Sequence, residues 1–447
     1  MKERFDKYLD VLARTERLPL HELASYQQTL LRRLVQHAYD RAPFYRERLH
    51  CLFAADGKID LSRWNDVPIL RRDNVVRHRD RLRVRDLQAE YGEIAEPWTS
   101  GSTGAPLQVA TNGLLLQVAN ALLTRTARRF GMDTARPLAV IRLPAHVPIE
   151  PYPDGNSRSG WSGTDPATPY YELDVTTPVA LQIEWLSRRK PSYLHTLPSG
   201  ALGIAFAVSS AAGRELGIKT VLMYGETVPE GTRAFIFERL GARAAAIYAC
   251  EEIGHIASEC EAAPHYHVAA ESALVEIVDE QGRDVRPGER GRVIVTGLYN
   301  YAMPFIRYEI GDFALAGASS CLCGRSLPVI TRIEGRARNA FLFRDGTRVW
   351  PRTFMVDAMR PFVAFSRFQL VQLDFERLEM RVIPDGSERT PDLAGLTLCA
   401  RRLIHQSAEI EVVEVEILAP GLGGKFEEFI SEVQGSGVPH GSAARSG

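Results

Sequence analysis

The chain has 447 residues, of which 45% are hydrophobic and 24% are charged, and its formal net charge is −1 at pH 7. This length predicts two or three domains, and a net charge near zero argues against nucleic acid or an anionic membrane as a partner. Residues 1–19 are charged and lack the apolar segment of a signal peptide, and the chain has no run of about 18 apolar residues. Because it has only six cysteines, we expect a cytoplasmic protein without a disulfide framework.

Residues 1–50 are expected to form helices, because apolar residues recur at helical spacing until Pro43. The middle of the chain alternates helical and strand-like segments. Helices are predicted at 115–130, 181–189, 201–212 and 231–241, and strands at 137–144, 219–226 and 244–250. This alternation is typical of an α/β domain with a largely parallel sheet.

A β-rich pattern follows from about residue 268, with strands predicted at 273–280 and 291–298. After Gly335 the pattern indicates a smaller α+β unit. Its strands are predicted at 368–375, 377–384 and 412–419, and its helix at 392–406. Residues 435–447 are small and polar, and we expect them to be disordered.

The segment WTSGSTGAP, residues 98–106, combines glycines with closely spaced hydroxyl side chains. Glycines let successive backbone N–H groups converge on an anion, and the hydroxyls add donors. Taken alone, such a segment is as typical of a surface loop. It is not a Walker loop, because GxxxxGK[ST] is absent.

Further short motifs follow this segment in order along the chain. They are YGE at 224–226, YACEEIG at 248–254, RYEIGD at 307–312, GR at 335–336 and GGK at 423–425, together with HAYDRAPFYRERL at 37–49, TLPSG at 196–200 and IASEC at 256–260. In order and spacing they resemble the adenylate-forming ligase superfamily, in its phenylacetate–CoA ligase-like or capsular-polysaccharide-protein-like branch. The resemblance implies an N-terminal adenylation domain at 1–335, with mixed sheets, flanking helices and a β-rich part, and a mobile α+β lid at 336–434.

The resemblance also implies a nucleotide site. Its phosphate loop would comprise Thr99, Ser100, Gly101, Ser102, Thr103 and Gly104. Its adenine and α-phosphate segments would comprise Gly225, Glu226, Tyr248, Ala249 and Glu251. The chain departs from the family at Leu107, where many relatives have lysine, and at Glu251, where threonine or serine is usual.

Three residues are implied in catalysis. Glu252 would bind Mg²⁺, which prefers carboxylate oxygens; without the surrounding motifs it would be taken for a solvated charge at a helix start. Arg336 would contact ribose or phosphate, and Lys425 would reach the α-phosphate and the attacking carboxylate on a glycine-rich tether. Asp312 would accept both ribose hydroxyls. The family's hinge aspartate falls at or next to Arg338, where Asn339 is its nearest replacement.

Cysteine and histidine residues form a second group. Cys260, His267, Cys321 and Cys323 suit a tetrahedral structural Zn²⁺ site, such as some members of this branch have, with Cys250, His255 and His265 as alternative ligands. Reduced thiols without metal are the other interpretation. Cys51 and Cys399 lie in apolar segments typical of a core.

The resemblance implies that ATP and a carboxylic acid form an acyl adenylate, which most often reacts with coenzyme A. An amine acceptor, giving an amide, and a non-catalytic nucleotide-binding relative are the alternatives. The acid would contact His195 and Tyr224, with walls from 140–165, 195–200 and 222–226, and the aromatic and proline-rich walls favour an aryl or other compact acid. We expect a monomer or homodimer.

Overall fold

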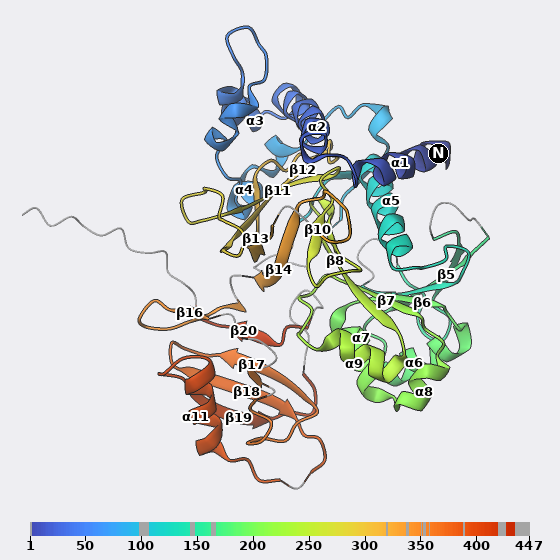
Figure 1. The fold of residues 1–447 in the computed structure, drawn as a ribbon, viewed down its shortest axis with the longest axis vertical. Coiled ribbons are helices and arrows are strands. Elements are labelled where there is room, and N and C mark those ends of the chain that lie inside the picture. Colours follow the sequence, from blue (N-terminus) through green and yellow to red (C-terminus); the bar gives the residue numbers. More distant parts are fainter. Residues whose placement is uncertain are drawn as a thin grey trace, which may run out of the picture. The chain divides into compact units, whose positions relative to one another are not determined.

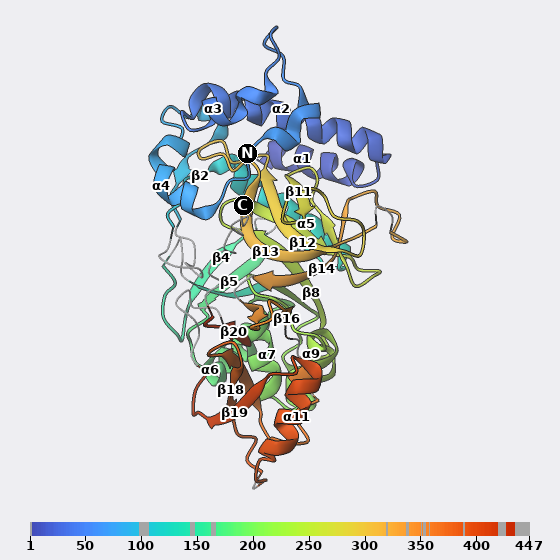
Figure 2. The same ribbon diagram turned by 90° about the vertical axis from the view of Figure 1, so that its left-hand side faces the viewer.

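The computed structural model describes residues 2–97, 107–143, 148–161, 167–318, 321–336, 339–349, 351, 355–356, 358–387, 389–418 and 426–433. They form two compact units, one ending at Gly335 and the other beginning at Arg336 (Figures 1 and 2). Each unit has its own hydrophobic core.

The first unit contains a twelve-stranded mixed sheet in the order β11-β12-β13-β14-β10-β9-β8-β7-β6-β3-β5-β4. Its parallel part consists of β5 (Pro169–Asp174), β3 (Leu138–Arg142), β6 (Tyr193–Thr196), β7 (Thr220–Tyr224) and β8 (Arg243–Cys250). Its antiparallel strands are β4 (Asn156–Ser159), β9 (Gly254–Glu259), β10 (Tyr266–Val268), β11 (Ala273–Val278), β12 (Arg290–Gly297), β13 (Tyr308–Ala316) and β14 (Val329–Arg336).

Helices cover both faces of the parallel strands. One face packs against α5 (Gly113–Arg129), whose Ala127 shares a core with Leu222 of β7. The other face is covered by α6 (Val179–Arg189), α7 (Pro198–Ala207), α8 (Ser210–Glu215) and α9 (Thr232–Leu240) (Figure 1). Residues two apart on a strand point to the same face, so alternate positions of β3, β6 and β7 face α5.

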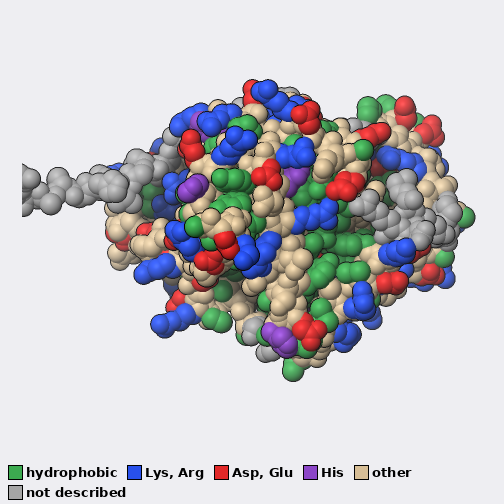
Figure 3. Space-filling model, turned by 90° about the horizontal axis from the view of Figure 1, so that it is seen from above, with side chains coloured by type: hydrophobic (Ala, Val, Ile, Leu, Met, Phe, Trp, Pro, Cys, Tyr) green, Lys and Arg blue, Asp and Glu red, His purple; other side chains and the backbone are tan. Residues whose placement is uncertain are grey.

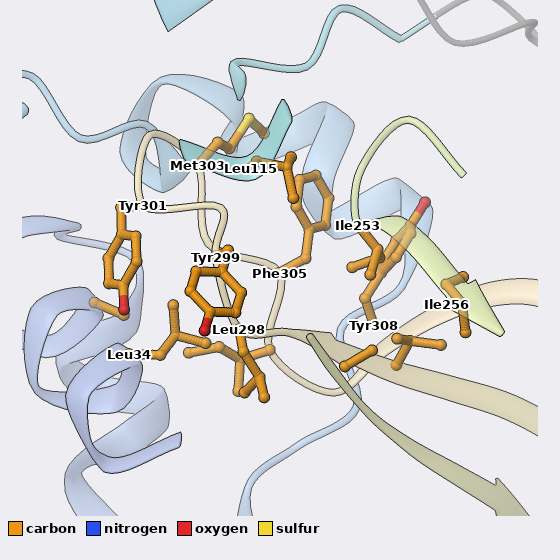
Figure 4. Close-up of a cluster of buried hydrophobic side chains, with 14 of the residues drawn as sticks. Leu34, Leu115, Ile253, Ile256, Leu298, Tyr299, Tyr301, Met303, Phe305 and Tyr308 are labelled. Atoms are coloured by element: carbon orange, nitrogen blue, oxygen red, sulfur yellow. The ribbon is translucent and has the colours of Figure 1, made fainter. Parts of the chain in front are cut away.

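The N-terminal segment adds helices over the antiparallel strands. They are α1 (Lys2–Thr15), α2 (Leu20–Arg41), α3 (Tyr45–Leu49) and α4 (Arg72–Leu82), with 3₁₀ turns at His50–Leu52, Leu61–Asp66 and Ala89–Tyr91 and short strands β1 (Ile94–Ala95) and β2 (Thr111–Asn112). They enclose the buried loop between β12 and β13. Figure 4 shows Tyr299, Tyr301 and Phe305 of this loop clustered with side chains from α2, α5 and β9.

The second unit has a four-stranded sheet in the order β19-β18-β17-β20. Its elements are β15 (Phe341–Leu342), β16 (Arg348–Val349), β17 (Arg367–Gln372), β18 (Arg377–Ile383), α11 (Leu393–Leu403), β19 (Glu409–Glu414) and β20 (Phe429–Ser431). Asp392 caps α11 by accepting a hydrogen bond from the Gly395 amide at 2.9 Å. The unit buries Leu370, Met380 and Leu396 in one core.

The predicted α/β class is confirmed. One prediction is wrong in detail, because the helix expected at 201–212 is divided into α7 and α8. Ser209 separates them in an extended conformation, and its hydroxyl accepts a hydrogen bond from the Ala212 amide. The strand expected at 412–419 begins earlier, at Glu409, where it pairs in parallel with β18. Residues 435–447 lie outside the described part of the chain.

The surface carries both signs of charge. Figure 3 shows basic and acidic side chains interspersed over the face that it displays. Among the described residues, no helix combines the length and the apolar character needed to cross a bilayer.

Candidate functional site

The end of β8 and the middle of β13 bring two predicted nucleotide-site residues together. The Tyr248 hydroxyl donates a hydrogen bond to Asp312 Oδ2 at 2.7 Å, although the residues are 64 positions apart. Asp312 follows Gly311, whose φ of +88° is the left-handed conformation that favours glycine. The RYEIGD motif therefore presents a carboxylate beside the aromatic ring of Tyr248.

Glu252 lies just beyond β8 and is buried, with 7% of its surface exposed. The Tyr308 hydroxyl donates to its Oε1 at 3.3 Å, and the Asn300 side chain donates to its backbone oxygen at 3.2 Å. Burial, then the charge of Glu252, raises the pKa of Tyr308 well above its ordinary value. Figure 4 shows Tyr308 and Ile253 within the hydrophobic cluster.

No lysine or arginine in the described part of the chain forms an ion pair with Glu252. Burying a carboxylate without a counter-charge is costly. A hard divalent cation is the partner that carboxylate oxygens prefer. The Glu252 environment therefore fits Mg²⁺.

The segment 225–227 is held between two elements. The Glu226 carboxylate accepts hydrogen bonds from the Ser199 amide at 2.9 Å and the Ser199 hydroxyl at 3.0 Å, at the start of α7. Gly225 has φ +80°. A Cβ on Gly335 would lie 2.7 Å from Thr227 Oγ1, so this close approach requires glycine. Arg336, the last residue of β14, thus follows a glycine that contacts the 225–227 segment.

Other predicted nucleotide-site residues differ in accessibility. Ala249 lies in β8, and Glu251 is exposed. Leu107 is 4% exposed and lies in the main core, so its apolar side chain contributes to packing. Asn339 Oδ1 is buried and has no hydrogen-bond partner among the described residues. Residues 99–104, Arg338 and Lys425 lie outside the described part of the chain.

The two residues predicted to contact the acid are neighbours. The rings of His195 and Tyr224 have centroids 4.5 Å apart and an interplanar angle of 47°. They lie at the carboxyl ends of β6 and β7, the edge at which parallel α/β sheets bind ligands. Burial lowers the pKa of His195 to about 4 and raises that of Tyr224, so both side chains are neutral at pH 7.

An ion cluster stands at the same edge of the sheet. Arg142, at the end of β3, donates through Nε to Glu172 Oε1 at 2.8 Å, and Arg158 forms a second ion pair with this carboxylate. Tyr170 donates to Glu172 Oε1 at 3.1 Å. Burial opposes ionisation of Glu172, but the two arginines lower its pKa. This buried carboxylate is fully paired.

The predicted metal-binding residues converge in the β-rich part. Ligand atoms of Cys260, His265, His267 and Cys321 all lie within 4.8 Å of one another. Cys323 Sγ lies 3.2 Å from His267 Nε2. The structure thus brings together the four predicted ligands and also His265, which the sequence indicated as an alternative; Cys250 and His255 are not in this group.

The environment of these groups suits Zn²⁺. His267 Nδ1 lies 3.4 Å from the Leu327 carbonyl, which leaves Nε2 to act as a ligand. Burial, then His265, lowers the pKa of His267 to about 4, so its imidazole is neutral. Burial raises the pKa of Cys260 to about 12, so a metal would have to displace its proton.

The Cys/His group is tied to α1 through Arg325. Arg325 donates to Glu261 at 2.6 Å and lies 3.4 Å from Glu16, which follows α1. Glu16 also forms an ion pair with Arg129 of α5. A metal at this group would therefore stabilise the packing of the N-terminal helix.

Comparisons with known proteins agree with this architecture. No protein-family model matches the chain. Phenylacetate–coenzyme A ligase of Thermus thermophilus is 27% identical over 353 residues, which are 75% of each chain. The enzyme of the same name from Pseudomonas putida is 25% identical over 356 residues, 74% of each chain. A solved structure of 2-hydroxyisobutyryl-CoA ligase in the postadenylation state, with 2-HIB-AMP, has a TM-score of 0.73 at 19% identity and covers 94% of this chain and 92% of its own.

The chain is similar to adenylate-forming coenzyme A ligases. Its sequence is similar to phenylacetate–coenzyme A ligases over three quarters of its length. The likeness to 2-hydroxyisobutyryl-CoA ligase supports the fold over both units.

Several residues of the site were missed by sequence reasoning. Tyr308 lies inside the RYEIGD motif, yet its contact with Glu252 joins residues 56 positions apart. Asn300 donates a hydrogen bond to the Glu252 backbone oxygen, and Thr227 lies against Gly335. Of these three residues, only Tyr308 lies in a motif that the sequence singled out.

Proposed function

We propose that the protein is an ATP-dependent acid–coenzyme A ligase that forms an acyl or aryl adenylate and then a thioester. The observation that supports this most strongly is Glu252, a buried carboxylate with no basic partner among the described residues. It lies four residues after Tyr248, which donates a hydrogen bond to Asp312. The similar proteins are named as coenzyme A ligases.

In the first half-reaction, a carboxylate oxygen of the acid attacks the α-phosphorus of ATP. The new P–O bond forms as the bond to the bridging oxygen of the β-phosphate breaks, and pyrophosphate leaves. Both reactants are anions, so positioning and charge stabilisation supply most of the catalysis. Glu252 would hold Mg²⁺, which neutralises triphosphate charge.

The chain's own residues would orient the nucleotide. Asp312 would accept hydrogen bonds from the ribose hydroxyls while Tyr248 holds one of its oxygens. Gly225 and the Tyr248 ring would form the adenine slot, and Arg336 would contact ribose or phosphate. Lys425 would stabilise the charge that develops on the α-phosphate, and residues 99–104 would bind the β- and γ-phosphates.

In the second half-reaction, the sulfur of coenzyme A attacks the acyl carbon. The C–S bond forms, the thiol loses its proton, and AMP leaves with the electrons of the C–O bond. We propose that the second unit acts as the lid that presents Lys425 for adenylation and withdraws it for thioester formation. The 335–339 segment, where the units divide, would be the hinge.

We also propose a structural Zn²⁺ site on the Cys/His group. Two thiols and two imidazoles within 4.8 Å match the donors that structural zinc selects. Cys323, beside His267, supplies a further thiol. The metal would join the 260–267 and 321–323 segments and, through Arg325, the end of α1.

The test is product formation by the purified protein. It is incubated with ATP, Mg²⁺, coenzyme A and a mixture of benzoates, phenylacetates and fatty acids, and products are identified by mass spectrometry. An acyl-CoA and one AMP per thioester are expected, with neither formed by Glu252→Gln. A second incubation also contains amines. If it yields an amide and no thioester, the acceptor is an amine, and if neither product forms, the proposal is contradicted.

A further inference from the structure

Asn300 joins segments that are far apart in the chain. It lies in the loop between β12 and β13 and is fully buried. Its Nδ2 donates hydrogen bonds to the Ala110 carbonyl at 3.1 Å and to the Glu252 carbonyl at 3.2 Å. Its Oδ1 accepts a hydrogen bond from the Met303 amide at 3.2 Å. The side-chain amide thus uses both of its N–H donors and its oxygen on backbone groups.

The Glu252 carbonyl lies outside the hydrogen-bond ladder of the sheet. The strands β8 and β9 last pair at Cys250 and Gly254, so residues 251–253 form the turn between them. A buried backbone carbonyl outside a ladder needs another donor. Asn300 supplies that donor and so fixes the backbone of the turn at Glu252.

A second contact holds the carboxylate of Glu252. The Tyr308 hydroxyl donates a hydrogen bond to Glu252 Oε1 at 3.3 Å. Tyr308 is buried, and its ring packs edge-on against Phe305 with the ring centroids 5.0 Å apart. Because side chains in a close-packed interior occupy a single rotamer, the hydroxyl of Tyr308 is held in place. The backbone and the carboxylate of Glu252 are therefore each held by a side chain from another part of the chain.

The contact with Ala110 extends this link to a third segment. Ala110 directly precedes β2, which pairs with β1. These two strands flank residues 99–104, the predicted phosphate segment, which lies outside the described part of the chain. Through Asn300, the backbone at Glu252 is thus tied to the residue that leads into β2.

We infer that Asn300 and Tyr308 are positioning residues for the metal ligand Glu252, with Asn300 fixing its backbone and Tyr308 its carboxylate. The inference rests on the proposed function, because that function assigns Mg²⁺ to Glu252. Residues that orient a metal ligand from behind contribute to metal affinity without contacting the metal. Loss of either contact should therefore weaken metal binding and leave the binding of metal-free nucleotide intact.

The test measures metal binding in the absence of catalysis. Mn²⁺ replaces Mg²⁺, and α,β-methylene-ATP replaces ATP because the bond between its α- and β-phosphorus atoms is not cleaved. Free Mn²⁺ is measured by electron paramagnetic resonance. Asn300→Ala and Tyr308→Phe should each raise the Kd for Mn²⁺ by about 10-fold or more, as should Glu252→Gln. The Kd for the nucleotide without metal should stay at the wild-type value in all three variants.

Gln182→Ala is the matched control. Gln182 is also buried, and its side-chain amide donates hydrogen bonds to the carbonyls of Val175 and Thr177 at 3.1 and 2.7 Å. These carbonyls belong to the segment between β5 and α6 rather than to the predicted nucleotide site. Gln182→Ala should therefore lower the melting temperature, as Asn300→Ala does, but keep the wild-type Kd for Mn²⁺.

Pyrophosphate exchange gives a second measurement. In Asn300→Ala, the Mg²⁺ concentration that gives half-maximal exchange should rise by the same factor as the Kd for Mn²⁺, and saturating Mg²⁺ should restore most of kcat. Tyr308→Phe preserves the volume of the ring, so it tests the inference even where Asn300→Ala does not fold. A wild-type Kd for Mn²⁺ in every folded positioning variant, with Glu252→Gln weakened, would overturn the inference alone. Wild-type Mn²⁺ binding in Glu252→Gln would overturn the metal assignment of the proposed function as well.

Discussion

Replacing Asp312 with alanine should weaken nucleotide binding by removing an acceptor for the ribose. The hydrogen bond from Tyr248 at 2.7 Å orients this carboxylate, whose oxygens can each accept more than one hydrogen bond. A hydrogen bond to a charged group contributes about 1.5–3 kcal/mol. Losing one ribose contact should therefore raise the Kd for ATP by about 10- to 150-fold.

Calorimetric titration with ATP and with 2′-deoxy-ATP isolates this contact. The wild-type protein should bind ATP more tightly than the deoxynucleotide, whereas Asp312→Ala should bind the two alike. Tyr248→Phe is the matched control, because it removes the hydroxyl that holds Asp312 but keeps the carboxylate, and it should retain most of the discrimination. Unchanged ATP affinity in Asp312→Ala, with its melting temperature preserved, would refute the ribose role.

Three further predictions follow from the same site and from the Cys/His group. Glu252→Gln should slow ATP–pyrophosphate exchange by at least about 100-fold with an unchanged circular dichroism spectrum; exchange near the wild-type rate would remove Glu252 from the metal site. In Lys425→Ala, adenylation should be slower by about 100-fold or more. The same variant should convert a presynthesised acyl adenylate and coenzyme A to the thioester at the wild-type rate. Equal losses in both steps would show that Lys425 does not serve adenylation alone. Protein purified without metal-affinity resin should carry about one equivalent of zinc, which Cys260→Ser should lose and the control Cys51→Ser should keep; stable, active wild-type protein without metal would contradict the site.

The order of elements was predictable because it depends on local patterns. The helix expected at 115–130 is α5, and the strands expected at 137–144 and 219–226 contain β3 and β7. Apolar periodicity is strong there because each element buries one face or stripe against a core. The break between α7 and α8 was missed, since it depends on a single capping hydroxyl, that of Ser209.

The pairwise contacts of the site were beyond local patterns. The motifs indicated Tyr248, Asp312 and Glu252 individually. The contacts from Tyr248 to Asp312 and from Tyr308 to Glu252 depend on the order of strands across the sheet, which local periodicity does not encode. The residue types and spacing of the Cys/His group did indicate its members. In the structure these residues meet because β10 pairs with both β9 and β14, which brings the segments that carry them together.

The central claim is that the chain catalyses adenylate formation from a free acid and ATP. Acid-dependent exchange of labelled pyrophosphate into ATP, measured without any acceptor, tests it most directly. We predict exchange that requires Mg²⁺ and one class of carboxylic acid and that is abolished in Glu252→Gln. Tight ATP binding without exchange, across aromatic and aliphatic acids, would contradict the claim and indicate a nucleotide-binding protein that does not form adenylates.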